Sequence, residues 1–353
     1  VMDIDVSEKR QTEIDEHLHK AFSADLLDKQ ANDRYKFAHD QILQSFLGMK
    51  STYAANEDLV LGHVLLSLFR TQPKAKEWAL FGALQSLKVC SASLPRESQM
   101  ALVDDHLLAA TKAAKKSAFY EAAEYSMGAL KLLMLASSDP WTEHIELCQS
   151  IHLMTARYSL ACGKHDDCES VLKALLEHTA PNSQEKTDAY LTLACSLRNQ
   201  SKIPDSIAVL TEALAEMGEK VPTSAGLITK KMSSNETKKK FGKLSDSDIL
   251  NLPPIKDRHN RNKMRLFSTL FLNMYHEYQK DTMWLVLKRM LILTSEIGVC
   301  NDTPLILAAH AYHLTNKGDF TGGSHFGKLA TKMTEKLNAK ANLPIVTFFL
   351  VVF

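Results

Sequence analysis

The amino-acid sequence predicts an all-α protein, built as an α-solenoid of stacked helical pairs. Leu, Ala, Lys and Glu dominate its 353 residues, whereas Gly and Pro are few, at 13 and 10 residues. Over most of the chain, apolar residues recur at i, i+3, i+4 and i+7, which is typical of amphipathic helices. Pairs of such helices repeat at a spacing of roughly 40 residues, and repeats of this length indicate a solenoid.

The overall composition excludes several classes of protein. The chain is 45% hydrophobic and 24% charged, like ordinary soluble proteins. Its formal net charge of +1 provides no general field that attracts nucleic acid or an anionic membrane. The apolar end at 343–353 is far shorter than the ~20 residues of a membrane span. No CxxC pair occurs among the cysteines, which favours reduced thiols and a cytoplasmic location. The cysteines are Cys90, Cys148, Cys162, Cys168, Cys195 and Cys300.

The first 50 residues contain the strand-like pattern of the chain. "DLLDKQANDRYKFAHD" (25–40) has two short runs around the turn-forming "AND" and predicts a β-hairpin. "QILQSFLGM" (41–49) then follows a helical pattern. A hairpin beside helices predicts a winged-helix-like segment at 1–50, and connecting helices are expected at 51–100.

The clearest repeat unit is "TDAYLTLACSLRNQSKIPDSIAVLTEAL" (187–214). Its apolar and small residues predict two helices that pack face to face, and small side chains at Ala194 and Ser206 allow a close approach. This spacing matches the tetratricopeptide pattern. The residues expected to pack are Tyr190, Leu193, Ala194 and Leu197 on the first helix and Ser206, Leu210 and Ala213 on the second.

The same frame fits three further segments, at 103–130, 149–176 and 304–331. We therefore expect tetratricopeptide-like pairs at 101–220 and further pairs at 258–353, the last of them truncated at the C-terminus. Neighbouring pairs of this kind stack because one pair cannot bury its apolar stripe alone. The residues that start the second helices are Phe119, His165, Ile203 and Phe320, and the packing residues are Phe119, Ala122, Cys168, Leu172, Phe320 and Gly323.

A polar stretch at 221–257 interrupts this rhythm. It contains Pro222, Pro253 and Pro254, and it is locally basic. The composition predicts a solvated loop between repeats, with 223–248 mobile. A docking site for an acidic partner or a membrane surface is the alternative. No aromatic residues are interleaved with the lysines to favour single-stranded nucleic acid. The lysines are Lys230, Lys231, Lys238, Lys239, Lys240 and Lys243.

No recognisable catalytic motif is present, and the chain is predicted not to be an enzyme. It lacks GxxxxGK[ST], GxGxxG, GxSxG and HExxH patterns and the kinase motifs. Cys162, His165 and Cys168 lie within "CGKHDDC", but a metal site needs a further ligand, so packing is the favoured interpretation. The aromatic and histidine groups "YHEY" (275–278) and "HAYH" (310–313) are likewise expected to serve packing.

An ordered series of motifs resembles a known family. "RYKFAHDQILQSF" (34–46) resembles the "FxHDxxQxA" segment that ends the ATPase region of large AAA or STAND-type signalling ATPases. These proteins are often fused to serine/threonine or histidine kinase domains. "LLAATKAAKKSAFYEAAEYSMGALKLL" (107–133), "LTEALAEMGEKVP" (210–222) and "ILNLPPIKD" (249–257) then resemble successive parts of their repeat region. The resemblance covers nearly the whole chain.

This resemblance implies a non-catalytic regulatory and protein-interaction segment of a signal-transduction ATPase or an ATPase-coupled kinase. ATP or ADP with Mg would be bound by the parent protein, and no cofactor by this segment. In the family, a histidine of the winged-helix part approaches the nucleotide phosphates. The resemblance assigns that role to His39, with Asp40 capping the following helix. The alternative for this pair is a buried histidine beside a helix cap.

The expected partner is a protein or peptide, or neighbouring domains of the same chain, and neither nucleic acid nor a membrane span is expected. A stand-alone tetratricopeptide adaptor that binds a peptide in its concave groove is the alternative function.

Overall fold

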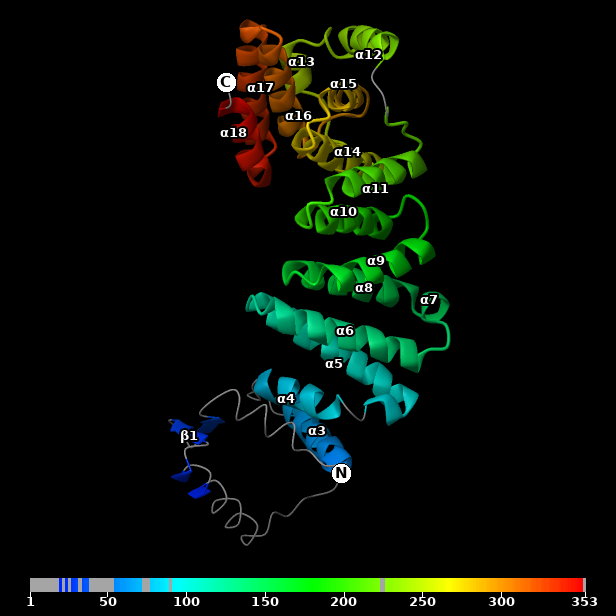
Figure 1. Ribbon diagram of the computed structural model, residues 1–353, viewed down its shortest axis with the longest axis vertical. Coiled ribbons are helices and arrows are strands. Elements are labelled where there is room, and N and C mark those ends of the chain that lie inside the picture. The colour runs from blue at the N-terminus through cyan, green and yellow to red at the C-terminus, as the bar shows by residue number, and fades with distance from the viewer. Residues whose placement is uncertain are drawn as a thin grey trace. The chain divides into compact units, whose positions relative to one another are not determined.

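The structure is a computed structural model, and it shows the all-α, solenoid-like fold that the sequence predicts (Figure 1). The chain divides into two compact units, Val1–Leu94 and Pro95–Phe353, which are described separately. The residues described are 19–20, 23–24, 27–30, 34–37, 54–71, 77–88, 91–222 and 226–351.

The first unit contains the predicted β-hairpin. Strand β1 (Leu27–Gln30) pairs antiparallel with β2 (Arg34–Phe37), and Leu27 lies opposite Phe37. The two strands therefore occupy the two runs that the sequence predicts. Helices α3 (Ala54–Thr71) and α4 (Glu77–Leu87) pack against each other, and the short helix η1 (Ser91–Ser93) ends the unit. The helix expected at 41–49 lies outside the described residues.

Five helical hairpins form the framework of the second unit. Each first helix packs on its second helix, and the hairpins follow one another along the unit (Figure 1). Neighbouring first helices also touch, since α10 contacts both α8 and α14. The hairpins are α5 (Arg96–Lys115) with α6 (Phe119–Ala136), α8 (Ile145–Ala161) with α9 (His165–His178), α10 (Gln184–Asn199) with α11 (Ile203–Glu216), α14 (Arg258–His276) with α15 (Lys280–Ile297), and α16 (Thr303–Asn316) with α17 (Phe320–Lys336).

All five hairpins share one turn geometry. A residue with positive φ stands two positions before each second helix. The next backbone N–H returns to the first helix, as when Lys202 N donates to Leu197 O at 2.9 Å and Asp319 N to Leu314 O at 3.0 Å. This is the Schellman ending of a helix. The positive-φ residues are Ser117, Gly163, Ser201, Tyr278 and Gly318, with φ of 61°, 75°, 61°, 55° and 85°.

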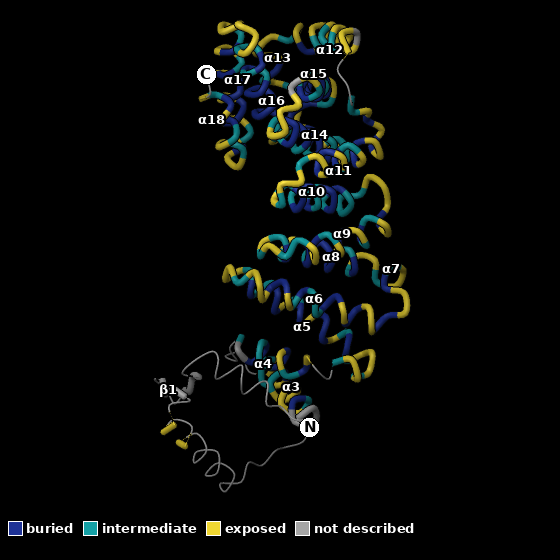
Figure 2. Tube along the Cα trace, viewed as in Figure 1, coloured by how far each residue is buried: buried dark blue, intermediate teal, exposed yellow. Residues whose placement is uncertain are grey.

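The repeat frame places the second helices correctly. Phe119, His165, Ile203 and Phe320 are the first residues of α6, α9, α11 and α17. Most of the expected packing residues are buried, and Figure 2 shows that buried residues line the facing sides of paired helices. A Cβ on Gly323 would approach Thr315 Oγ1 to 2.0 Å, so only glycine allows this contact. The buried residues are Ala122, Cys168, Leu172, Tyr190, Ala194, Leu197, Ser206, Leu210, Ala213 and Gly323.

Three expected packing residues are not buried. Phe119 is 38% exposed and Phe320 is 70% exposed. Each occupies the first position of its helix, beside the turn, and the buried face begins three residues later. Leu193 is half-buried because it precedes the buried Ala194 and therefore lies about 100° around the helix from it.

The prediction of a loop at 221–257 is wrong. Residues Leu227–Lys240 form α12 and Asp246–Leu250 form α13, and α12 packs on α15. The prolines do not prevent this, since all three lie outside these helices. Ser245 and Asp248 form a reciprocal capping box that starts α13. Phe241, only 2% exposed, anchors the end of α12 in the core. Composition alone therefore underestimated the tertiary packing of this insertion.

A close backbone contact joins the end of the insertion at 221–257 to the helical hairpins. Gly298, with φ of 105°, lies against the backbone of Pro253, where a Cβ would approach the carbonyl oxygen to 2.1 Å. Val299 N donates to Pro253 O at 2.9 Å, and Ile255 N donates to Val299 O at 2.9 Å. These bonds attach the end of the insertion to the segment between α15 and α16.

The remaining elements are α7 (Pro140–Glu143), η2 (Lys340–Asn342) and α18 (Leu343–Val351). Helix α18 packs on α16 and α17, and its Phe349 is fully buried beside Tyr275. Among the described helices, none has the length and apolar character required to cross a bilayer.

Candidate functional site

The two residues expected to sense nucleotide, His39 and Asp40, lie outside the described residues. Their role therefore stays a prediction. In the described part of the chain, three features bring polar or aromatic side chains together: a cysteine–histidine cluster, a buried charge cluster and an aromatic pocket.

The cysteine–histidine cluster joins two hairpins. His165 Nδ1 lies 3.1 Å from Ser196 Oγ, and Ser196 Oγ donates to Glu169 Oε1 at 3.2 Å. This differs from a catalytic triad, in which the carboxylate would contact the histidine. Cys168 is buried, and burial raises the pKa of its thiol to about 12. Within the described ranges, no three metal-binding side chains gather. The cluster therefore packs α9 against α10.

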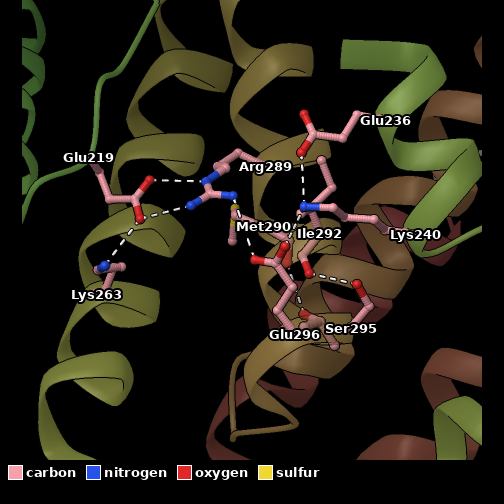
Figure 3. Close-up of polar contacts among 10 residues, drawn as sticks. Glu219, Glu236, Lys240, Lys263, Arg289, Met290, Ile292, Ser295 and Glu296 are labelled. Carbon is pink, nitrogen blue, oxygen red and sulfur yellow. Dashed lines mark hydrogen bonds and ion pairs between the residues drawn. The ribbon is translucent and has the colours of Figure 1, made fainter. Parts of the chain in front are cut away.

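The charge cluster anchors the insertion. Glu219 is 8% exposed, and it accepts two hydrogen bonds from Arg289 at 3.0 Å and one from Lys263 Nζ at 3.1 Å (Figure 3). Burial raises the pKa of Glu219, but the bonds from Arg289 and Lys263 outweigh it and leave the pKa below its usual value. Both cations of the cluster, Arg289 and Lys263, are paired with the Glu219 carboxylate, so we interpret this cluster as structural.

The aromatic pocket is the candidate site. It has a volume of about 370 Å³ and lies where the turn of hairpin α14–α15 meets the C-terminal end of α16. Its lining combines aromatic rings with polar groups at one end. The residues that line it are Tyr275, Tyr278, Met283, Trp284, Tyr312, His313, Asn316 and Lys317.

Three half-buried rings form the walls of the pocket. Tyr275 belongs to the last turn of α14, Trp284 to the start of α15 and Tyr312 to the last turn of α16. The ring centroid of Tyr312 lies 6.0 Å from that of Tyr275 and 6.0 Å from that of Trp284. Burial and a hydrogen bond to Tyr312 raise the pKa of Tyr275. The walls are therefore ordered by the core behind them.

Tyr278 stands at the mouth of the pocket in an unusual conformation. It occupies the positive-φ position of its turn, with φ of 55°, and it is 82% exposed. The same position in the other hairpins holds serine or glycine. A bulky residue in the left-handed region is strained, and an exposed ring gains nothing from burial. Such outliers cluster at functional sites.

The polar end of the pocket is positively charged. Lys317 has no ion-pair partner among the described residues. Burial, followed by the charge of Lys317, lowers the pKa of His313 to about 3, so this imidazole is neutral near pH 7. Burial also lowers the pKa of Lys288, and repulsion by Lys317 and Lys230 contributes.

Sequence reasoning assigned both segments that form this pocket, "YHEY" and "HAYH", to packing. They do pack, but they also meet to form a cavity. One signal in the sequence could have indicated the pocket. The turn position that holds glycine or serine in the other hairpins holds a tyrosine, Tyr278, in this one.

The repeated hairpins define an all-α helical-repeat fold, and the pocket is its candidate site. In comparisons with known proteins, no family model matches the chain, and no curated protein matches it.

Proposed function

We propose that the chain is a non-catalytic protein-interaction segment that captures a protein or peptide partner through the aromatic pocket. The observation that carries this proposal is Tyr278, a strained and exposed aromatic side chain at the mouth of the cavity. Exposed aromatic residues beside ordered pockets are typical of recognition surfaces.

The size of the pocket supports capture of one side chain rather than a large ligand. Its volume of about 370 Å³ lies near the lower end of the range for ligand sites, about 300–1,000 Å³. The hairpins on either side extend the surface available to the rest of a peptide, and stacked helical repeats commonly bind partners in this way.

The setting that we propose for this segment is a large cytoplasmic signalling ATPase or ATPase-coupled kinase. Its support is the ordered resemblance of 34–46, 107–133 and 210–222 to such proteins. The parent protein would bind ATP or ADP with Mg, and the hairpins would bind in trans or to its neighbouring domains. A reading frame with a P-loop upstream supports this setting, whereas a start codon just before Val1 favours a stand-alone adaptor.

The binding function is tested by selecting peptides from a random library on the intact chain. Each selected peptide is then titrated against Tyr278→Gly and the control Tyr120→Ser. Tyr120 lies in the first turn of α6, and it is 58% exposed. We expect Tyr278→Gly to weaken binding about tenfold, since aromatic hot spots contribute this much or more. Equal affinity of all selected peptides for the three proteins would contradict the proposal.

A further inference from the structure

Building on the proposed function, we propose that the pocket selects an aromatic side chain that bears or adjoins an anionic group. The ring would lie among Tyr275, Trp284 and Tyr312, and the anionic group would meet Lys317 at the polar end of the pocket.

The walls suit a planar ring. Tyr275 and Tyr312 meet edge to face, with 70° between their planes, and Trp284 lies tilted beside Tyr312 at 41°. Aromatic rings attract one another in edge-to-face and offset arrangements. A ring bound between these side chains could therefore form both edge-to-face and offset-stacked contacts. Met283 adds a polarisable thioether, which also favours aromatic contacts.

The charge at the polar end of the pocket determines whether an anionic or a cationic ligand is favoured. Two carboxylates close in sequence make contacts of their own: Asp281 forms an ion pair with Lys230 at 2.7 Å, and Asp319 accepts a hydrogen bond from the backbone N–H of Gly322 at 2.8 Å. Glu277 is exposed but does not line the pocket. Lys317, in contrast, lines it and has no ion-pair partner among the described side chains. None of these carboxylates belongs to the residues that line the pocket, so the charge at its wall is the positive charge of Lys317.

The helix ends do not reverse this preference. Helices α14 and α16 end at the pocket, and a helix C-terminus favours cations. However, the returning N–H groups of Gln279 and Asp319 occupy the carbonyls of Met274 and Leu314, both at 3.0 Å. These hydrogen bonds therefore offset part of the negative partial charge at the C-terminus of each helix.

A cationic ligand is the main competing occupant, because clustered aromatic rings also bind quaternary ammonium groups. The charge of Lys317, which lines the pocket, opposes it. The depressed pKa values of Lys288 and His313 indicate the same positive environment, since lysine charges contribute to both after burial. An anion would relieve this repulsion.

The test is a fluorescence titration of the intact chain with small probes. The probes are N-acetyl-phosphotyrosine amide, N-acetyl-tyrosyl-aspartate amide, N-acetyl-tyrosine amide, inorganic phosphate and tetramethylammonium. Loss of the signal in Trp284→Phe shows that it comes from the pocket. We expect both anionic aromatic probes to bind at least about tenfold more tightly than the neutral N-acetyl-tyrosine amide, because charge-assisted hydrogen bonds are stronger than those between neutral groups. The ratio between them distinguishes a phosphate from a carboxylate source.

Two matched variants complete the experiment. Lys317→Gln should remove the preference for the anionic probes, whereas Lys332→Gln, an exposed lysine of α17 outside the pocket, should keep it. Tighter binding of tetramethylammonium, or equal binding of the neutral and anionic rings, would overturn the inference. The selected peptides would still bind through Tyr278 in that case, so failure here is distinguishable from failure of the proposed function.

Discussion

Tyr278 and Gly318 occupy the same position in successive hairpin turns, two residues before the second helix. Their φ angles are 55° and 85°, in the region where glycine is favoured. Gly318 follows that preference and Tyr278 does not. Neither backbone geometry nor burial accounts for a tyrosine that is 82% exposed at this position.

Replacing this tyrosine should stabilise the protein. We expect Tyr278→Gly to raise the free energy of unfolding by about 1 kcal/mol, because the left-handed conformation costs a residue with a Cβ roughly 1–2 kcal/mol. Urea denaturation measures the change. Tyr278→Ala is the control, since alanine retains the strain and should bring no comparable gain. A less stable glycine variant would show that the Tyr278 ring supports the fold.

The hairpin α10–α11 should depend on Leu210. Its side chain is fully buried, and Leu210→Ala leaves a cavity in the core. The expected loss is about 2–5 kcal/mol in the free energy of unfolding. Val209→Ala on the same helix is half-buried and should cost less. A loss of under about 0.5 kcal/mol for Leu210→Ala, the range of ordinary surface changes, would refute the repeat frame.

Gly298 should tolerate no side chain. The alanine Cβ in Gly298→Ala would approach Pro253 O to 2.1 Å, and the positive φ of 105° adds strain. We expect a loss of at least about 1–3 kcal/mol, the cost of one strained backbone position. Gly163→Ala provides the control, because its φ of 75° is also positive but no atom lies within 4 Å of the added Cβ. Thermal unfolding of both variants checks the difference.

Glu219 should make the free energy of unfolding depend on pH in the acidic range. Its pKa is lower in the folded protein than in the unfolded chain, so its contribution is complete above the unfolded pKa and is lost as pH falls through the folded pKa. Glu219→Gln should cost about 1.5–3 kcal/mol at pH 7, the range for hydrogen bonds to charged groups. The difference between the two proteins should shrink below about pH 4. A constant difference would contradict the assignment.

His310 and His313 of α16 should also affect the free energy of unfolding, at higher pH than Glu219 does. Burial lowers the pKa of His310 to about 4 and that of His313 to about 3. The unfolded chain takes up these protons first, so stability is complete above about pH 6.5 and falls as pH decreases below it. Each histidine contributes up to about 1.4 kcal/mol per pH unit in that range.

Urea denaturation at pH 7 and pH 5 measures this effect. The double variant His310→Gln/His313→Gln should lose less stability between the two values than the natural chain does. His106 and His152 also have lowered pKa values, so the variant should retain part of the response. An unchanged response would show that the two α16 histidines are accessible to protons in the folded state.

The sequence by itself determined the local features of this protein. Helical periodicity depends on neighbouring residues, and the shared turn marks Phe119, His165, Ile203 and Phe320 as starts of second helices. The β-hairpin around "AND" depends on a few adjacent residues in the same way. Such features are encoded within one turn or one helix, and local propensity is sufficient to predict them.

Only the tertiary structure decided the insertion and the pocket. Residues 227–240 are polar, and they become helical against α15, where Phe241 and the pair of Lys240 with Glu296 dock them. The pocket requires Tyr275 and Tyr312, which are distant in the chain, to meet when two hairpins stack. Burial and repulsion by Lys317 at His313 likewise arise only after packing. Contacts between distant segments leave no local pattern, because their energy depends on the assembled neighbours.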